Sequence, residues 1–522
     1  MSGTEITVDL ARSSNANIMV AFERNASTRP DDPALEYGAR SYTYAELMCE
    51  VRELAGAMAR RGIGRGTVVG MLGFNSDGFV KVWMAASYLG AIFTPINYRL
   101  APPEIKYVLE SAEPRVVFVD AELLDVFRAA QSLAGSAATL VELADGVIRT
   151  EMLGEESMAD PHVLMARLTA DDVHRLVFTS GTTGYPKGAL ISHGNVLWKN
   201  MSHQRELSLG RADVSLICGP MYHVGAFDSS LSSAFHVGSK IVVQRRFDSD
   251  KVIERIAKGD ITNIWLAPVM IQAILRDTTS RTSDLGSIRL IISGGEKIPE
   301  PLILELFDVF PNAWFADAYG LTESVSAVAF LEPRQTTAKR GSVGRPIAYS
   351  EFIIADESGA ELPAGEVGEI LVRSPMVFQG YWNDPEATQV ALRGGWLHTE
   401  DLGCRDTEGY LYIVDRLKDM IRTGGENVAS LEIERVLYEH PAVEAAAVVG
   451  RSDEQWGQVP WAFVVLREET PPEDLRTFCA ANLAKYKVPK GFTFVQDLPR
   501  NPSGKILKRV LRDRLSETAA AT

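Results

Sequence analysis

Hydrophobic and polar positions in the first 330 residues follow helical and extended periodicities in turn. Residues 43–62 read TYAELMCEVRELAGAMARRG, in which Thr43 and Glu46 have the spacing of a capping box. Apolar side chains then recur every three or four positions, which predicts one buried helical face. That face comprises Leu47, Val51, Leu54 and Met58. Gly62 is expected to stop the helix, because glycine readily adopts the left-handed backbone of a C-terminal cap.

Short apolar runs separate the predicted helices. The run TVVGML at 67–72 precedes a helical pattern at 77–91, and the run IFTPI at 92–96 follows it. Similar runs stand at 115–120, 240–244, 263–268 and 289–294. Short buried strands that alternate with helices are typical of mostly parallel sheets covered on both faces. The pattern therefore predicts an α/β fold.

The pattern changes near residue 340. Residues 341–374 are rich in turn-forming residues and short alternating runs, which predicts a small antiparallel β unit. After residue 415 the chain begins again as a compact α+β unit, with helical patterns at 431–440 and 473–489. We therefore expect a large N-terminal domain over residues 1–415 and a small, mobile C-terminal domain over residues 416–522.

Length and charge argue against several classes of protein. The chain has 522 residues, enough for about two to four domains, and a formal charge of −15. This charge disfavours a nucleic-acid partner and leaves no polybasic patch for a membrane surface. The longest apolar run, residues 82–93, is too short to span a bilayer, and the N-terminus lacks an apolar signal core. We expect a cytoplasmic protein without integral membrane contact.

Four cysteines are scattered along the chain without the spacing of a metal site. They are Cys49, Cys218, Cys404 and Cys479. We expect reduced, partly buried thiols, as in most cytosolic proteins.

A loop of small and hydroxyl residues, FTSGTTGYPKG at 178–188, lies between two strand-like runs. Its glycines let backbone N–H groups approach an anion, and Lys187 adds a positive charge. The sequence fits neither a Walker A loop, which runs straight into a helix, nor the dinucleotide pattern GxGxxG. The alternative is a mobile surface loop, because such residues are common in loops. If the loop binds phosphate, it belongs to another architecture.

Four further motifs favour the phosphate interpretation. They are YGLTES at 319–324, WLHTEDLG at 396–403, YIVDRLKDMIRTGGENVASLEIE at 412–434 and PRNPSGK at 499–505. With the loop they resemble, over nearly the whole chain, the adenylate-forming superfamily of acyl-CoA synthetases, adenylation domains and luciferases. Within this superfamily, the sequence is most similar to acyl-CoA synthetases that act on fatty or aromatic acids. The resemblance implies a large domain with αβαβα sheets and a small β-barrel subdomain.

The resemblance also implies a two-step ligase reaction that uses ATP, Mg²⁺ and coenzyme A. A hydrophobic carboxylic acid attacks the α-phosphorus of ATP, which gives acyl-AMP and pyrophosphate, and a thiol then displaces AMP. Because the first step brings two anions together, the protein must neutralise charge and hold an in-line geometry. The implied catalytic residues are Lys187, His223, Thr322, Glu323 and Lys505.

The motifs imply roles for individual residues of the nucleotide site. The loop cradles the β- and γ-phosphates, Tyr319 lies against adenine, and Asp401 accepts the ribose hydroxyls. Arg416 reaches the ribose or a phosphate, and Glu323 with Thr183 ligates Mg²⁺. The implied nucleotide set is Thr179, Ser180, Gly181, Thr182, Thr183, Gly184, Lys187, Gly294, Gly295, Glu296, Asp317, Ala318, Tyr319, Gly320, Thr322, Asp401, Arg416 and Lys505.

The remaining implied residues serve the acyl group, the thiol and the hinge. The acyl pocket would comprise His223, Val224, Gly225, Phe227, Gly294 and Val325. The coenzyme A tunnel would comprise Gly424, Gly425 and Trp456. Lys418 would be the hinge about which the C-terminal domain turns. Lys505 would stabilise negative charge near the α-phosphate in the first step.

Several alternatives stay open. The acceptor thiol could belong to a carrier protein, or the chain could be a non-catalytic nucleotide- or acyl-binding protein. The stretch FDSS, which contains Asp228, resembles the site of the aspartate with which amino-acid-activating domains hold an amine, whereas its place after His223 and before VGSKIVV aligns better with acyl-CoA synthetases. Trp456 fits ordinary partial burial as well as a pantetheine contact. A homodimer and a lysine acetyltransferase acting on Lys505 are further candidates for partners, and the acid itself is undetermined.

Overall fold

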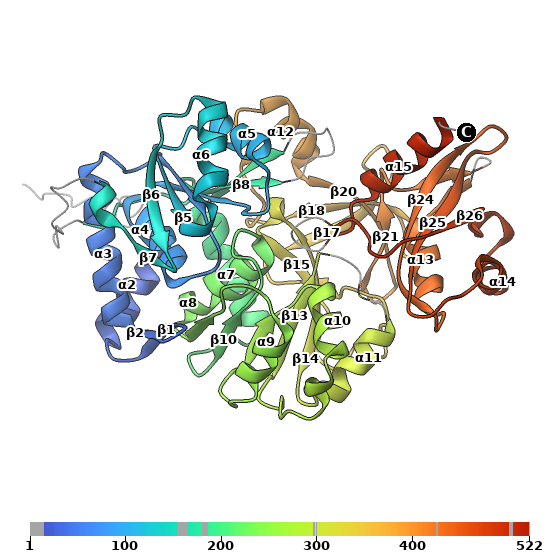
Figure 1. Ribbon diagram of the computed structural model, residues 1–522, viewed down its shortest axis with the longest axis horizontal. Helices are drawn as coiled ribbons and strands as arrows, with labels where there is room; N and C mark the ends of the chain where they lie inside the picture. The colour runs from blue at the N-terminus through green and yellow to red at the C-terminus, as the bar shows by residue number, and fades with distance from the viewer. Residues whose placement is uncertain are drawn as a thin grey trace, which may run out of the picture.

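The computed structural model describes residues 15–153, 164–179, 186–295, 298, 300–423, 426–500 and 505–520. Figure 1 shows a large body and, at one side of it, a smaller C-terminal part coloured orange to red. Two large mixed sheets lie in the body, and a third, smaller sheet lies towards the C-terminal part.

The first sheet has eight strands in the order β19-β9-β8-β4-β3-β5-β6-β7. They are β19 (Gly380–Tyr381), β9 (Lys187–Ser192), β8 (Val173–Thr179), β4 (Ile92–Ile96), β3 (Val68–Leu72), β5 (Val116–Asp120), β6 (Thr139–Ala144) and β7 (Val147–Ile148). Strand β3 pairs in parallel with β4 and β5, as the alternating pattern predicts. Helices α5 (Pro102–Ala112) and α6 (Leu124–Ala134) pack their apolar residues against this sheet.

The second sheet has nine strands in the order β16-β15-β14-β13-β12-β10-β11-β1-β2. They are β16 (Arg345–Pro346), β15 (Ser326–Phe330), β14 (Trp314–Leu321), β13 (Leu290–Gly294), β12 (Asn263–Trp265), β10 (Val214–Ile217), β11 (Lys240–Val243), β1 (Pro33–Tyr37) and β2 (Arg40–Thr43). The pairs β10–β11, β12–β13 and β13–β14 are parallel. Helices α9 (Ser249–Ile256), α10 (Pro268–Arg276) and α11 (Glu300–Val309) share an apolar cluster with this sheet.

Buried helices join the two sheets. They are α2 (Met19–Thr28), α3 (Tyr44–Arg60), α4 (Asp77–Leu89), α7 (His193–Glu206), the π-helix η3 (Gly225–Ser232) and α8 (Ser233–Val237). The predicted capping box of α3 is present, because the Thr43 side chain accepts from the Glu46 N–H. Helix α4 is buried along its whole length, and Trp83 on it packs against Phe227 of η3 with ring centroids 4.9 Å apart. The α/β class is confirmed.

The antiparallel unit predicted after residue 340 is also present. Strands β17 (Glu351–Ala355), β18 (Gly368–Arg373), β20 (Leu397–Arg405) and β21 (Leu411–Arg416) pair antiparallel in that order. In the part of the chain that the structure describes, these strands form an open four-stranded sheet where a small barrel was expected. Helix α12 (Pro385–Ala391) lies beside β19.

The C-terminal part is α+β, as predicted. Its strands are β22 (Ile421–Thr423), β23 (Glu426–Val428), β24 (Val443–Asp453), β25 (Gly457–Leu466) and β26 (Gly491–Phe494). Helices α13 (Ser430–Tyr438), α14 (Pro472–Asn482) and α15 (Lys508–Ala520) accompany this sheet. Short 3₁₀ turns along the chain are η1 (Ala121–Leu123), η2 (Thr150–Leu153), η4 (Thr278–Arg281), η5 (Thr322–Ser324), η6 (Arg393–Gly395) and η7 (Lys485–Lys487).

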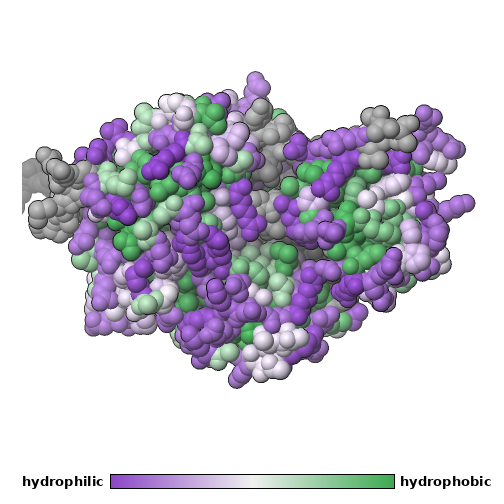
Figure 2. Space-filling model, viewed as in Figure 1, coloured by the Kyte–Doolittle hydropathy of each residue, from purple (hydrophilic) through white to green (hydrophobic). Residues whose placement is uncertain are grey.

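Two further expectations can be compared with the structure. Within the described ranges, no helix is both long and apolar enough to cross a membrane. Hydrophilic residues cover much of the face in Figure 2, and hydrophobic residues gather over the C-terminal part and over the upper part of the large body. Cys49, Cys218 and Cys479 are free thiols, of which Cys218 and Cys479 are buried.

Candidate active site

The glycine-rich loop is framed by a β-hairpin. Strands β8 and β9 pair antiparallel with Thr179 opposite Lys187, and the Thr179 hydroxyl donates to the Lys187 carbonyl oxygen over 3.3 Å. The predicted strand–loop–strand order is therefore confirmed. Eight candidate residues lie outside the described ranges: Ser180, Gly181, Thr182, Thr183, Gly184, Glu296, Gly424 and Gly425.

Lys187 and Glu323 meet at a third residue, Tyr381. The Lys187 ammonium nitrogen lies 5.1 Å from the centroid of the Tyr381 ring, a distance typical of a cation–π contact. The Tyr381 hydroxyl donates to Glu323 Oε1 over 2.9 Å. Burial raises the pKa of Glu323, although the hydrogen bond from Tyr381 favours the charged form. The sequence interpretation missed Tyr381, which β19 brings to this place by pairing with β9.

A second polar cluster joins Tyr319, Asp401 and Arg416. The Tyr319 hydroxyl donates to Asp401 Oδ2 over 3.0 Å, and Arg416 Nε lies 3.2 Å from Asp401 Oδ1. Asp401 and Arg416 face each other across β20 and β21. Burial, with the Asp401 carboxylate, raises the pKa of Tyr319. Arg416 and Asp401 also act electrostatically on Glu323, so this cluster lies near the first one.

Backbone geometry explains the glycines at the ends of β13 and β14. A side chain at Gly320 would place its Cβ 1.9 Å from the Ser326 carbonyl oxygen, and one at Gly294 would lie 2.6 Å from that of Ala318. Gly295 has a φ of +91°, which favours glycine. Asp317 stands opposite Ser293 in the same strand pair, and Thr322 begins η5 directly after β14.

His223 lies in the turn before η3, and its ring accepts from the Gly225 N–H at Nδ1 over 3.1 Å. Burial lowers its pKa to about 4, and the charge of Lys505 acts in the same direction. The ammonium of Lys505, on the C-terminal part, is therefore within electrostatic reach of His223 in the large body. In this arrangement the two parts share one site.

The segment predicted to line the acyl pocket has two faces. Gly225 lies against the indole of Trp265, since a Cβ there would be 2.3 Å from the ring, and Gly219 lies against the same ring. Phe227 instead packs against Trp83. Val224 caps η3, and Val325 has a φ of +51° after η5. The sequence interpretation missed Trp265, whose signal was an aromatic residue at the end of a predicted strand.

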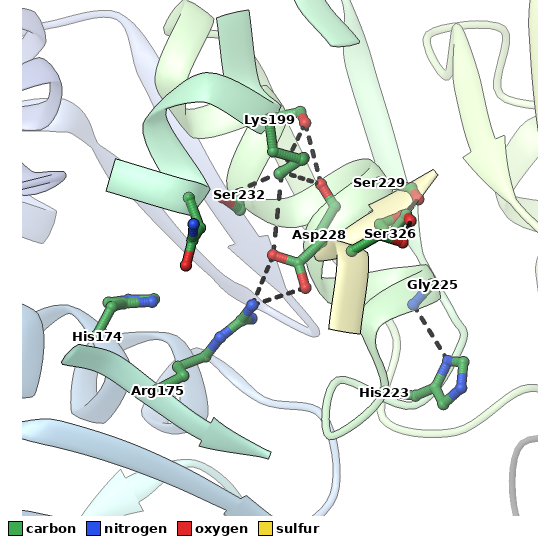
Figure 3. A network of polar contacts seen from close by, with 12 residues as sticks. His174, Arg175, Lys199, His223, Gly225, Asp228, Ser229, Ser232 and Ser326 are labelled. Atoms are coloured by element: carbon green, nitrogen blue, oxygen red, sulfur yellow. Dashed lines mark hydrogen bonds and ion pairs between the residues drawn. The ribbon is translucent and has the colours of Figure 1, made fainter. Parts of the chain in front are cut away.

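Asp228 is engaged inside the protein. Both of its carboxylate oxygens accept from Arg175 Nη2 over 2.8 Å, and Lys199 Nζ lies 4.0 Å from Oδ1. Figure 3 shows the Asp228 carboxylate between Arg175 and Lys199, while His223 and Gly225 lie to the other side. Lys199 also donates to the Asp228 carbonyl oxygen over 2.5 Å and to Ser233 Oγ over 3.1 Å. The geometry thus disfavours Asp228 as the partner of a substrate amine.

Lys418 and Trp456 lie on the C-terminal side of the site. Lys418 lies between β21 and β22 with an exposed side chain, and desolvation by the surrounding chain, together with the charge of Arg416, lowers its pKa. Trp456 is 44% exposed, and its backbone N–H donates to Asp453 Oδ1 over 3.0 Å. The exposure leaves this indole accessible for a ligand contact.

Family comparison identifies the architecture that carries this site. A family model described as AMP-binding enzyme matches residues 22–382, and one described as AMP-binding enzyme C-terminal domain matches residues 432–505. The chain belongs to the AMP-binding enzyme family. This assignment confirms the suspected resemblance to the adenylate-forming superfamily.

Relatives of this AMP-binding enzyme are ligases. The feruloyl-CoA synthase of an Amycolatopsis species is 35% identical over 94% of this chain and 97% of that protein. The indoleacetate–CoA ligase of Aromatoleum aromaticum is 35% identical over 94% of this chain and 96% of that protein. The structure of o-succinylbenzoate CoA synthetase from Bacillus subtilis with its acyl-adenylate intermediate has a TM-score of 0.85 at 31% identity, covering 94% of this chain and 98% of that one.

These comparisons confirm the predicted class of reaction for this AMP-binding enzyme. It is an AMP-forming acid–thiol ligase that works through an acyl-adenylate, with a carboxylic acid, ATP and coenzyme A as substrates. The Bacillus subtilis synthetase has also been solved with ATP and a magnesium ion, in agreement with the predicted cofactors.

Proposed function

We propose that this enzyme couples an aromatic carboxylic acid to coenzyme A. The relatives with the names feruloyl, indoleacetate and succinylbenzoate act on acids that carry an aromatic ring. In this chain the indole of Trp265 lies beside His223, with ring centroids 6.2 Å apart, and against the backbone of Gly225. A flat indole wall favours an aromatic acyl group, because aromatic rings pack well face to edge or offset.

The two polar clusters fit a nucleotide. In this proposal Asp401 and Arg416 bind the ribose, and Tyr319 lies against adenine. The other residues that the sequence motifs assign to nucleotide binding keep the roles that those motifs imply. Asp401 is buried, accepts a hydrogen bond from Tyr319 and forms an ion pair with Arg416, so its orientation is set before the nucleotide arrives.

Glu323 fits a magnesium ligand. Mg²⁺ prefers carboxylate and phosphate oxygens, and Glu323 presents a partly buried carboxylate oriented by Tyr381. When bound, the ion would neutralise phosphate charge. Lys187, held over the Tyr381 ring, brings a second positive charge to the same place. The contact of Tyr381 with both Lys187 and Glu323 is the observation that carries the proposal. It brings a positive charge for the phosphates and a carboxylate for Mg²⁺ to one place.

Lys505 and His223 serve the acid. Lys505 stabilises the negative charge that accumulates when the carboxylate meets the α-phosphate, and His223 is held neutral near the carboxylate. We propose that the small domain, residues 416–522, turns about Lys418 after this step. Gly424, Gly425 and Trp456 would then line the path of the thiol.

A pyrophosphate-release screen with Mg-ATP tests the proposal. Hydroxycinnamates, indole acids and benzoates are compared with fatty acids and amino acids, each with and without coenzyme A. We expect release with an aromatic acid and turnover to a thioester with coenzyme A. Selectivity for fatty acids would overturn the aromatic assignment. Release without thioester would point to a carrier-protein thiol, and no release with any acid would leave a binding protein.

Two matched variants locate the chemistry. Lys505→Ala is expected to slow acyl-AMP formation by about 100-fold or more while thioester formation from supplied acyl-AMP is retained. Glu323→Gln is expected to slow acyl-AMP formation and to raise the magnesium requirement. The exposed Lys490→Ala and Glu366→Gln are the controls. Equal loss in both half-reactions for Lys505→Ala would exclude its proposed role.

We also propose a cytoplasmic location and acetylation at Lys505. Acetylation removes the ammonium charge, so enzyme acetylated at Lys505 should lose adenylation. Retained activity at full modification would contradict this. A homodimer is a further proposal, which sedimentation of the purified chain would test directly.

A further inference from the structure

A buried polar cluster lies where the chain passes from the large body into the C-terminal part. Asp415, in β21, is 1% exposed. Its Oδ2 accepts from both the N–H and the hydroxyl of Ser430, each over 2.6 Å, and its Oδ1 accepts from the Arg416 N–H over 2.7 Å. Ser430 begins helix α13 of the C-terminal part. This carboxylate therefore ties the last strand of one part to the first helix of the other.

Lys508 completes the cluster. Its ammonium donates to Ser430 Oγ over 2.5 Å and pairs with Glu434 Oε1 over 2.8 Å. Burial opposes the charged form, but the carboxylates of Glu434, Asp415 and Asp419 outweigh it and raise the pKa of Lys508. Lys508, whose side chain is 11% exposed, is thus a cation that bridges Ser430 and Glu434, and through Ser430 it reaches Asp415.

A second contact follows one turn later on α15. Arg512 pairs with Asp419. Asp415 and Asp419 stand on either side of Lys418, which the sequence interpretation names as the hinge. Helix α15 is therefore attached directly to Asp419 and, one turn earlier, to Asp415 through Ser430.

The attachment matters because α15 begins at Lys508, three positions after Lys505. This spacing limits the distance between the two Cα atoms to about 11 Å. Lys505 lies within electrostatic reach of His223 in the arrangement seen here. A shift of the start of α15 would move Lys505 by a comparable distance, and misplacement by about 1 Å can slow a reaction about 100-fold.

We propose that Lys508 is a positioning residue for adenylation, which holds Lys505 in place by tying α15 to Asp415 through Ser430. The proposal rests on the proposed function of Lys505. It assigns no contact between Lys508 and substrate, and it predicts a selective effect on the first half-reaction.

Half-reaction kinetics test this role. Lys508→Met, which keeps the bulk and removes the charge, is expected to slow acyl-AMP formation about 10- to 100-fold. Thioester formation from supplied acyl-AMP should change less than about threefold, because it does not use Lys505. Lys508→Arg should restore most of the adenylation rate. The exposed neighbour Arg509→Met, on the same helix, is the control and should match the wild type.

Two outcomes would overturn the proposal: equal losses in both half-reactions, or unchanged adenylation in Lys508→Met. Because that variant leaves Glu434 unpaired, the double variant Lys508→Met/Glu434→Gln is measured beside it, and it should show the same selective loss. Limited trypsin digestion reports the tie without any substrate. Cleavage after Arg416 or Lys418 should be faster in Lys508→Met and unchanged in Arg509→Met.

Trypsin digestion also distinguishes failure of the proposed function from failure of the proposed tie between α15 and Asp415. If the wild type released no pyrophosphate with any acid, the proposed function would fail, while faster digestion of Lys508→Met would still show the tie. Digestion at the wild-type rate would exclude the tie itself.

Discussion

Two buried charge clusters in this molecule are built on different principles. Arg175, Asp228 and Lys199 come from β8, η3 and α7, all within the large body, and their side chains are at most 1% exposed. The hinge cluster joins Asp415 to Ser430, Lys508 and Glu434 of the C-terminal part. The first cluster therefore joins elements within the large body, whereas the second crosses the boundary that we propose to move.

The balance of charge differs as well. Burial lowers the pKa of Lys199 to about 7, because one carboxylate serves two cations. Lys508 faces three carboxylates, which raise its pKa despite burial. A cation with several partners keeps its charge and its hydrogen bonds when the surroundings change. The comparison shows that burial alone does not decide whether a lysine stays protonated. The number of carboxylates near its ammonium group decides it.

The largest expected effect is on the first cluster. Arg175→Met would leave the Asp228 carboxylate buried with only Lys199 near it, and the free energy of unfolding should fall by about 3 to 5 kcal/mol. Denaturant unfolding measures the loss. The double variant Arg175→Met/Asp228→Leu should recover most of it, since no unpaired carboxylate remains. A double variant as unstable as the single one would contradict this account.

Acid should weaken the region around the first cluster next. Burial lowers the pKa of His174, His203 and His236, to about 3 for His203 and about 4 for His236, and Lys199 acts in the same direction. Below pH 6.5 the unfolded chain binds protons that the folded chain refuses, so stability falls as pH falls. We expect a loss of about 3 kcal/mol between pH 6 and pH 5.

Urea midpoints at several pH values measure this dependence. His203→Gln, which can still donate to the Ala327 carbonyl oxygen that His203 contacts over 3.2 Å, should have a shallower slope. A slope equal to that of the wild type would exclude His203 as a contributor.

A smaller effect separates the two lysines directly. The pKa of Lys199 is lowered in the folded state, so the unfolded chain binds more protons between pH 7 and its ordinary value, and stability should rise with pH. Lys199→Met should remove about 2 kcal/mol of this rise between pH 7 and pH 9. The pKa of Lys508 is raised, so Lys508→Met should run parallel to the wild type over that range. If the curves of stability against pH ran parallel to that of the wild type for both variants, the proposed difference between Lys199 and Lys508 would be refuted.

The smallest effect concerns an exposed contact across the same boundary. Arg276 Nη2 of α10 lies 2.5 Å from Glu444 Oε1 of β24, and Arg276 is 51% exposed. Exposed ion pairs contribute about 0.2 to 1 kcal/mol and are screened by salt. Glu444→Gln should therefore change the ratio of the two half-reaction rates by at most about fivefold, and the change should vanish in high salt. A change that persists in high salt would indicate a role beyond charge.

Local pattern accounts for much of the fold and for part of the site. The capping box at Thr43 and the buried face of α3 follow from spacing within one helix, and the structure confirms both. The hairpin around the glycine-rich loop was likewise readable from flanking apolar runs. Tyr381 was missed, because its pairing partner in β9 lies about 190 residues earlier and no motif contains it. A small barrel was predicted, whereas strands β17, β18, β20 and β21 form an open sheet. Closure of a barrel depends on how the two edge strands of the sheet meet.

The sequence by itself determined the order of motifs, the alternation of helices and strands, and the class of reaction, because each is carried by short segments. Only the tertiary structure decided which distant side chains meet. Sheet pairing brings Asp401 to Arg416 and η3 brings Asp228 to Arg175, and such contacts depend on register and packing across the whole chain. The same holds for Lys508, whose tie to Asp415 forms only when α15 packs beside the hinge segment.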